Sequence, residues 1–319
     1  MHGRRFLLFI CMMLGVNLTA QEIDNTALYR SPGSEKAVRL FYENDLFAKS
    51  DEDYSQGISF ELNHPFFLKS PVTRILLKTK SVTRTGISLE HDAYTPSYLD
   101  TSGILRNDRP YAATLSVRSF RISEDTLRKF RLVSSFTLGV IGPAAGGKEI
   151  QTGIHKAING IRPLGWGNQI SNDLLVNYRV DAQKSLFTIT SRFLIAANAS
   201  VVVGSPYTGV NAGFAIMAGH FNSPFFKQAV IGKVRIYVYF QPVVSYLLYD
   251  ATLQGGLFSR SSVYVVSQNQ LHELRSLNTA GLVLEFGKLR LEGSFSARSN
   301  GNRNSAAHCW GGIHVGINF

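Results

Sequence analysis

The chain has 319 residues, and its 33 Lys and Arg outnumber its 22 Asp and Glu, which gives a formal net charge of +11. Hydrophobic residues make up 45% of the sequence, yet the mean hydropathy is only +0.01. Beyond the N-terminal segment there is no apolar run of about eighteen residues, so we expect no transmembrane helix. These values fit a soluble protein, and they equally fit a membrane β-barrel in which lipid-facing and inward-facing residues alternate.

Residues 1–20 have the pattern of a signal peptide. Arg4 and Arg5 form a positive n-region, and an apolar core over residues 6–14 is too short to span a bilayer. The small residues that end the segment suit cleavage before Gln21. We therefore expect an exported protein.

Cleavage would change the thiol content and the charge of the chain. Cys11 would be lost, so Cys309 would be the only thiol and no disulfide framework is expected. The charge would fall from +11 to +9, because two arginines leave with the signal. For an exported basic protein we expect no nucleic acid partner, and anionic outer-membrane lipid or lipopolysaccharide matches the charge better.

Apolar and polar residues alternate with a period of two along much of the remaining chain, which is the pattern of β-strands. The alternation is clearest over residues 57–62, 132–140, 173–180, 212–218, 234–240, 280–286 and 289–295. Only Gly287 and Lys288 separate the last two segments, which predicts a tight hairpin turn. Short turns that alternate with longer polar segments favour a barrel built from hairpins.

The C-terminal segment strengthens this interpretation. Ile313, Val315, Ile317 and the terminal Phe319 alternate with small or polar residues. An aromatic residue that ends an alternating strand is typical of bacterial outer-membrane barrels, and lipid does not tolerate an open sheet edge. We therefore predict an all-β fold, an outer-membrane antiparallel β-barrel of about twelve strands. Residues 21–319 would form this single, monomeric domain; a soluble sandwich is the alternative.

Two long segments, residues 97–108 and 142–169, do not alternate, and loops on a rigid scaffold usually carry the functional groups. The second begins with a Gly/Pro break and then predicts a short helix in an extracellular loop. Gln151 and His155 are four residues apart and share one face of that helix, whereas Glu149 points elsewhere. His155 is a candidate catalytic group, although a lone histidine in a loop more often has a structural role.

Several carboxylates are candidate oxygen ligands for a hard cation such as calcium: Asp45, Asp51, Asp53, Asp92 and Asp108. They do not form a tight calcium-binding loop, and each is as readily a solvated loop residue or an ionic partner of Arg109.

Motifs for a serine nucleophile elbow, a His-Glu-x-x-His zinc site and a phosphate-binding glycine loop are absent from the sequence. Hydrolysis is therefore expected to use an activated water, with His155 as its general base. Calcium held at Asp45 would polarise an ester carbonyl.

Several motifs, in this order along the chain, resemble those of the outer-membrane lipid A 3′-O-deacylases. They are Asn44-Asp45, Asp53-Tyr54-Ser55 followed by Gly57, the run from His91 to Pro96, Asp108-Arg109, the segment from Val140 to His155, Trp166 with Gln169, and the run from Thr252 to Gly255. The resemblance covers nearly the whole mature chain, and the segment from Val140 to His155 is its most specific part.

The resemblance implies an outer-membrane barrel that removes the acyloxyacyl chain ester-linked at the 3′ position of lipid A, with calcium as cofactor. It implies that His155 is the catalytic histidine and that Asn44, Asp45, Ser55 and Gln151 belong to the active site. Asp45 and the Ser55 hydroxyl would be metal ligands.

Two departures from the family bear on specificity. The segment from Ser97 to Thr101 lacks the basic residues that the family carries there, and Ile161 and Pro163 stand where the family has Glu and Tyr. Recognition of phosphates or of the acyl pattern is therefore expected to differ. A channel or structural barrel, and a phospholipase with a serine nucleophile beside a histidine, are the alternative functions.

Overall fold

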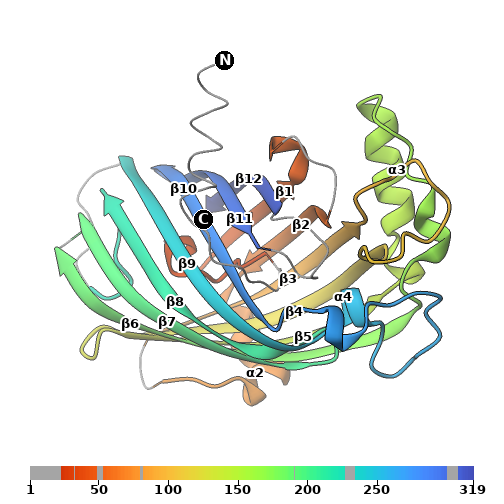
Figure 1. Cartoon of the computed structure of the whole chain (residues 1–319). Coiled ribbons are helices and arrows are strands. Elements are labelled where there is room, and N and C mark those ends of the chain that lie inside the picture. Colours follow the sequence, from red (N-terminus) through yellow and green to blue (C-terminus); the bar gives the residue numbers. More distant parts are fainter. Residues whose placement is uncertain are drawn as a thin grey trace.

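The computed structural model describes residues 23–31, 33–48, 53–79, 82–189, 191–226, 234–299 and 308–319. The signal peptide predicted for residues 1–20 therefore lies outside the described residues. Within them, twelve antiparallel strands close into one barrel, in which β1 pairs with both β2 and β12 (Figure 1). The predicted all-β fold, an antiparallel barrel of about twelve strands, is confirmed. No described helix has the length and apolar character needed to cross a membrane.

The strands follow one another around the barrel in chain order. They are β1 (Ala37–Asn44), β2 (Asp53–Asn63), β3 (Val82–Thr95), β4 (Ala112–Asp125), β5 (Phe130–Ile141), β6 (Asp173–Ile189), β7 (Phe193–Gly204), β8 (Tyr207–Gly219), β9 (Val234–Asp250), β10 (Leu274–Phe286), β11 (Leu289–Arg298) and β12 (His308–Asn318). Short helices lie before β1 and in the connections between strands: η1 (Leu28–Arg30), η2 (Asp45–Ala48), η3 (Pro65–Lys69), α2 (Val72–Ile75), η4 (Pro143–Ala145), α3 (Gly147–Ala157), η5 (Gly165–Asn168), α4 (Ala251–Gln254) and η6 (Gln268–Gln270).

The two ends of the barrel differ in the length of their connections. Residues 96–111, 142–172 and 251–273 form long loops at one end, which is the right-hand end in Figure 1 and carries α3 and α4. At the other end three connections have two to four residues, among them the predicted tight turn of Gly287 and Lys288 between β10 and β11, and only the β2–β3 and β8–β9 connections are longer. Outer-membrane barrels have short periplasmic turns and longer extracellular loops. The end with α3 is therefore the extracellular end.

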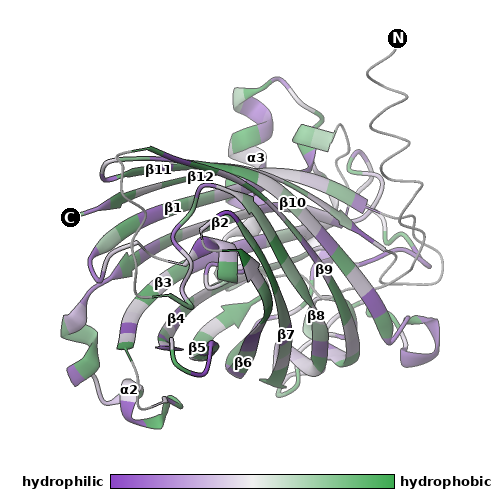
Figure 2. Cartoon of the chain, turned by 90° about the vertical axis from the view of Figure 1, so that its left-hand side faces the viewer, coloured by the Kyte–Doolittle hydropathy of each residue, from purple (hydrophilic) through white to green (hydrophobic). Residues whose placement is uncertain are grey.

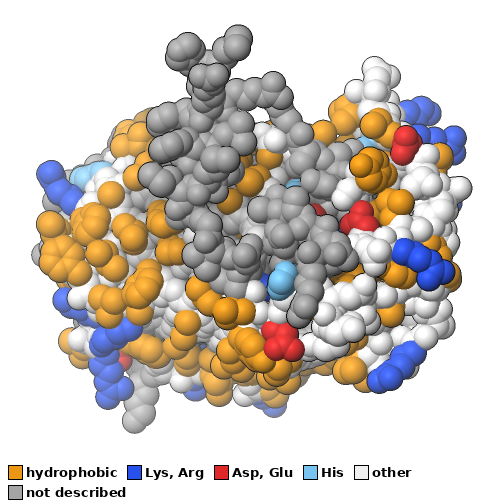
Figure 3. Space-filling view, in the orientation of Figure 1, with side chains coloured by type: hydrophobic (Ala, Val, Ile, Leu, Met, Phe, Trp, Pro, Cys, Tyr) orange, Lys and Arg blue, Asp and Glu red, His pale blue; other side chains and the backbone are white. Residues whose placement is uncertain are grey.

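The alternation in the sequence separates the two faces of the wall. Leu40 and Phe60 point outward and are about half exposed, whereas Arg39 and Glu61 point inward, form an ion pair and are buried. Figure 2 shows hydrophobic stripes along the strands, and Figure 3 shows hydrophobic side chains over much of the visible wall. The outer surface thus presents apolar side chains to lipid, as membrane barrels require.

The segment before β1 lies in the lumen. Arg30 donates from its Nε to Glu292 Oε1 at 2.8 Å, and Tyr29 stacks on Tyr239 with ring centroids 3.6 Å apart. Asn25 donates from its Nδ2 to Ser59 Oγ at 2.7 Å. Residues 23–31 are therefore tied to several strands from inside and narrow the passage through the barrel.

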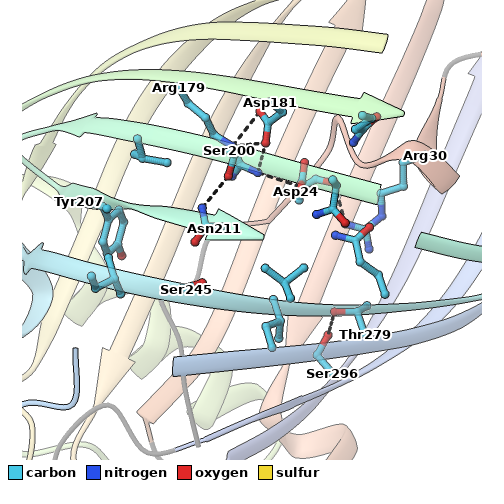
Figure 4. A pocket seen from close by; sticks show the side chains of 18 of the residues that line it. Asp24, Arg30, Arg179, Asp181, Ser200, Tyr207, Asn211, Ser245, Thr279 and Ser296 are labelled. Carbon is cyan, nitrogen blue, oxygen red and sulfur yellow. Dashed lines mark hydrogen bonds and ion pairs between the residues drawn. The ribbon is translucent and has the colours of Figure 1, made fainter. Parts of the chain in front are cut away.

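A small polar cavity of about 90 Å³ remains beside this segment (Figure 4). Arg179 bridges Asp24 and Asp181, with N–O distances of 3.1 and 2.7 Å, and Asn211 donates to Ser200 Oγ at 2.6 Å. Charged side chains in this part of the lumen are thus paired with one another, and their ion pairs and hydrogen bonds connect the N-terminal segment to the strands.

Candidate active site

Helix α3 begins where two glycines take up conformations that other residues adopt only with strain. Gly142 has φ of 101° and Gly146, at the N-cap, has φ of 74°. Three residues of α3, Gly147, Gln151 and His155, are buried, and they recur every four residues along one face. Gln151 and His155 therefore share one face, while Glu149 is exposed.

This buried face rests on the outside of the barrel. A Cβ atom at Gly147 would lie 2.4 Å from Ala113 Cβ and 2.7 Å from the Trp166 ring. Ala113 points outward, because its neighbour in β4, Thr114, hydrogen-bonds on the lumen side to Asp92. Helix α3 thus covers the outer wall of β3 and β4 at the extracellular end.

A row of outward side chains connects α3 with β1. Asn44 lies opposite Gln56, Gln56 opposite Ala93, and Ala93 opposite Ala113, and residues directly opposite each other share a face of the sheet. With strands about 4.8 Å apart, the row is roughly 14 Å wide. Asn44 and the first turn of α3 therefore lie along one strip of the outer wall, which we call the outer row.

His155 is held in one tautomer. Its Nδ1 lies 2.5 Å from the carbonyl oxygen of Ile161, and a carbonyl only accepts, so Nδ1 carries the proton. The backbone N–H of Gly160 donates to the His155 carbonyl at 2.8 Å and closes the chain around the ring. With the proton on Nδ1, Nε2 is the ring atom that would carry the lone pair a general base needs.

Gln151 is oriented by Trp166. The indole Nε1 donates to Gln151 Oε1 at 2.7 Å, and Trp166 packs on Tyr111 with ring centroids 4.9 Å apart. The Gln151 Nε2 group is buried and has no hydrogen-bond partner among the described residues. Because this amide is fixed and its buried N–H groups have no acceptor in the described chain, it is suited to donate a hydrogen bond to a bound ligand.

The polar residues at the ends of β1 and β2 form the other part of the strip. Asn44 Oδ1 accepts from the Leu46 N–H at 2.8 Å, and Asp45, which directly follows Asn44, is buried. The Ser55 and Thr95 hydroxyl oxygens are 2.5 Å apart. Carboxylate, carboxamide and hydroxyl oxygens are the donors that calcium takes, so the chemistry of this set fits that ion.

Gln56 belongs to this site, and the sequence motifs do not identify it. It is 1% exposed, lies opposite Asn44, and its Nε2 has no hydrogen-bond partner in the described chain. A β-bulge between Tyr54 and Gln56 places Tyr54 inward, where it bonds Asp92, and leaves Gln56 on the outer face. The sequence feature that points to Gln56 is the break in the period-two alternation directly before Gly57.

The structure separates the candidate carboxylates. Asp92 points into the lumen, Asp53 pairs with Arg109 and Arg298, and Asp108 accepts from the Ser97 N–H at 2.8 Å. The proposed role of Asp53 as a partner of Arg109 is confirmed. Asp51 lies outside the described residues, and of the four carboxylates that are described, Asp45 is the one next to Asn44 in the chain.

Described His, Cys, Asp and Glu side chains form no group of three that would hold a metal. The candidate calcium ligands in this strip are the carboxylate of Asp45 and neutral oxygens such as those of Asn44 and Ser55.

Comparison with known proteins gives a family model and several solved structures. The model for the outer membrane protein LpxR matches residues 7–319. LpxR from Salmonella typhimurium is 18% identical and has a TM-score of 0.73, over 89% of this chain and 100% of that chain. The β domain of the Bordetella autotransporter BrkA is 12% identical with a TM-score of 0.45, over 89% and 98%. The KdgM porin is 7% identical with a TM-score of 0.40, over 89% and 99%.

No curated protein sequence matched the chain. The family model spans nearly all of its length, and the LpxR structure has the same fold. The chain therefore belongs to the LpxR family of outer membrane proteins, the lipid A 3′-O-deacylase family that its motifs resemble.

Proposed function

We propose that the protein hydrolyses the ester that links the acyloxyacyl chain to the 3′ position of lipid A. The observation that carries this proposal is the position of the buried α3 face, which lies on the outer wall beside the outer row instead of in the lumen. A lipid of the outer leaflet reaches such a site by lateral movement in the membrane, whereas a water-soluble substrate would not. Lipid A is the lipid of that leaflet, and its negative charge complements the net positive charge of the chain.

His155 would act as the general base. Its Nδ1–H donates to the Ile161 carbonyl, which orients the ring, and Nε2 would accept a proton from water. The water would then attack the ester carbonyl directly, and its proton would pass from Nε2 to the leaving alcohol. Ser55, whose hydroxyl pairs with Thr95, is not needed as a nucleophile in this scheme.

Amide donors would stabilise the developing oxyanion. The Gln151 Nε2 group is buried, and the hydrogen bond from Trp166 to the Gln151 oxygen fixes its direction. It therefore needs little reorientation when the oxyanion forms. Asn44 and Gln56 supply further amide groups on the same strip. When bound near Asp45, Asn44 and Ser55, calcium would add Lewis-acid polarisation of the carbonyl.

Mass spectrometry of lipid A from cells that express the protein tests the proposal. We expect the wild type to remove the 3′-linked chain and the His155→Ala variant to lose about 10²- to 10⁴-fold in rate, the usual contribution of a general base. Glu149→Ala, on the exposed face of the same helix, is the matched control and should retain activity. Chelation of calcium with EDTA should abolish the mass shift, and added calcium should restore it.

Two results would contradict the proposal: a wild type in calcium that leaves lipid A intact, or a folded His155→Ala barrel that still removes the chain. Parallel analysis of the phospholipids separates deacylation of lipid A from phospholipase activity.

A further inference from the structure

The connection between β2 and β3, residues 64–79, folds back over the outside of the barrel; we call it the strap. Three successive carbonyls, of residues 75–77, accept hydrogen bonds from side chains of neighbouring strands. The donors, in order, are the Tyr178 hydroxyl at 2.7 Å, Arg121 Nη1 at 3.0 Å and the Ser134 hydroxyl at 2.9 Å. The strap is therefore fixed across β4, β5 and β6, and Figure 2 shows α2 outside the wall.

The donors under the strap face away from the lumen. Arg118 points inward, where it pairs with Glu90, so Arg121, three positions further along β4, points outward. An arginine side chain exposed to lipid on the outer face of a barrel is destabilising. The strap leaves Arg121 only 7% exposed and satisfies it with a carbonyl. The strap is thus an integral part of the outer surface.

The strap is amphipathic and basic. Its exposed apolar side chains are Phe66, Leu68, Ile75 and Leu77. Its exposed charges, Lys69, Arg74 and Lys78, are all positive, and residues 64–80 contain no Asp or Glu. Apolar and aromatic groups beside basic ones are typical of segments that lie in a membrane interface.

A groove of about 480 Å³ opens between the strap and the wall. Phe66 and Phe67 line it from the strap, and Ile87, Val117, Phe136 and Leu138 line it from β3, β4 and β5. Polar side chains also line it, namely Lys69 and Ser70 from the strap and Ser119 from β4. An apolar groove with a cationic group beside it complements an acyl chain joined to an anionic head group.

The position of the strap identifies the leaflet. Along β4, Arg121 is eight residues from Ala113, which at about 3.4 Å per residue is roughly 27 Å. A strand tilt of about 45° reduces this to about 19 Å along the membrane normal. Since α3 lies over Ala113 at the extracellular end, the strap lies toward the periplasmic side, near the inner-leaflet interface of a hydrocarbon layer about 25 Å thick.

We propose that the strap groove binds one acyl chain of an anionic glycerophospholipid from the inner leaflet. Phe66 and Phe67 hold the chain against the wall, and Lys69, Arg74 and Lys78 neutralise the phosphate of the head group. This site is separate from the α3 site, and its occupancy does not depend on lipid A hydrolysis.

Native mass spectrometry of the full-length mature barrel, titrated in detergent with dioleoyl phosphatidylglycerol, tests the apolar part of the site. We expect one phospholipid to stay bound to the wild type. Ser119→Phe fills the groove from β4 and should weaken binding at least about tenfold, because it excludes several methylene groups. Ala212→Phe, an exposed outward position on β8, is the control and should bind as the wild type does. Heat-modifiable migration in gels verifies that both barrels are closed.

A second comparison tests the charge. Replacing Lys69, Arg74 and Lys78 by Gln should remove the preference for phosphatidylglycerol over phosphatidylethanolamine, whereas Lys148→Gln with Lys156→Gln on α3 should keep it. Equal retention by Ser119→Phe and Ala212→Phe would overturn the proposal. So would a competition in which lipid A, and not phospholipid, occupies the groove, because the occupant would then be the tail of an outer-leaflet lipid.

Discussion

At the scale of single residues, the candidate site contains groups that are buried with hydrogen-bonding capacity unused. Gln151 and Gln56 are each 1% exposed, and the amide nitrogen of each has no partner among the described residues. A buried, unsatisfied donor costs about 1–3 kcal/mol of stability. Such groups persist in folded proteins at sites where a ligand supplies the missing acceptor.

Gln56 allows this interpretation to be tested. Gln56→Met keeps the size of the side chain but removes the unsatisfied amide, so the barrel should unfold at an equal or higher temperature, while deacylation of lipid A should fall. Both quantities can be measured on purified protein, by thermal denaturation and by mass spectrometry of the lipid product. Gln268→Met, at an exposed loop position, is the control for the change of side chain. If the activity of Gln56→Met equals that of the control, Gln56 has only a packing role.

At the scale of elements, the fit of α3 against the wall depends on one residue without a side chain. Gly147 sits so close to Ala113 and Trp166 that even a methyl group would displace the start of the helix. Displacing α3 moves Gln151 and His155 together, and a misplacement of about 1 Å at a catalytic group costs on the order of 10²-fold in rate.

Gly147→Ala should therefore lower the rate of deacylation by about 10²-fold while the barrel stays folded. Gly153, in the same helix, has no atom within 4 Å of its would-be Cβ. Gly153→Ala should keep full activity and stabilise the helix by about 1 kcal/mol. The test is to compare the deacylation rates of the two variants on lipid A at equal amounts of folded barrel. Equal rates would show that α3 tolerates the shift.

At the scale of the whole molecule, the barrel is a closed wall whose lumen holds the N-terminal segment. Arg39 donates to the carbonyl oxygens of Arg30 and Asn25, and Arg131 and Arg290 donate to those of Thr26 and Tyr29. The N-terminal segment is thus held by guanidinium groups from several strands. This arrangement disfavours the alternative of a wide channel.

Planar bilayer recordings test the closed lumen. The wild type should show little ion conductance, whereas a variant that lacks residues 23–31 should conduct, because the passage would then be lined by unpaired charges. Lipid A hydrolysis is expected to survive partly in that variant, since the site is on the other side of the wall. A large, steady conductance of the wild type would restore the channel interpretation.

The sequence alone allowed the wall to be predicted because its signal is local. Alternation with a period of two identifies strands such as those around Leu40 and Val315 and also separates their two faces. The spacing of Gln151 and His155 likewise predicts a shared helix face from local geometry. The structure agrees with both.

Only the tertiary structure decided which polar groups meet. Asp53 and Asp92 are alike in the sequence, yet Asp53 pairs with Arg109 and Arg298, and Asp92 lies in the lumen. The face of the wall on which each carboxylate lies follows from the strand register and from the bulge before Gln56. A shift of one residue in either moves a side chain to the opposite face, and both depend on pairing with residues that are distant in the sequence. Local periodicity thus determines that this chain is a membrane barrel, and long-range pairing determines that its candidate site lies on the outer wall.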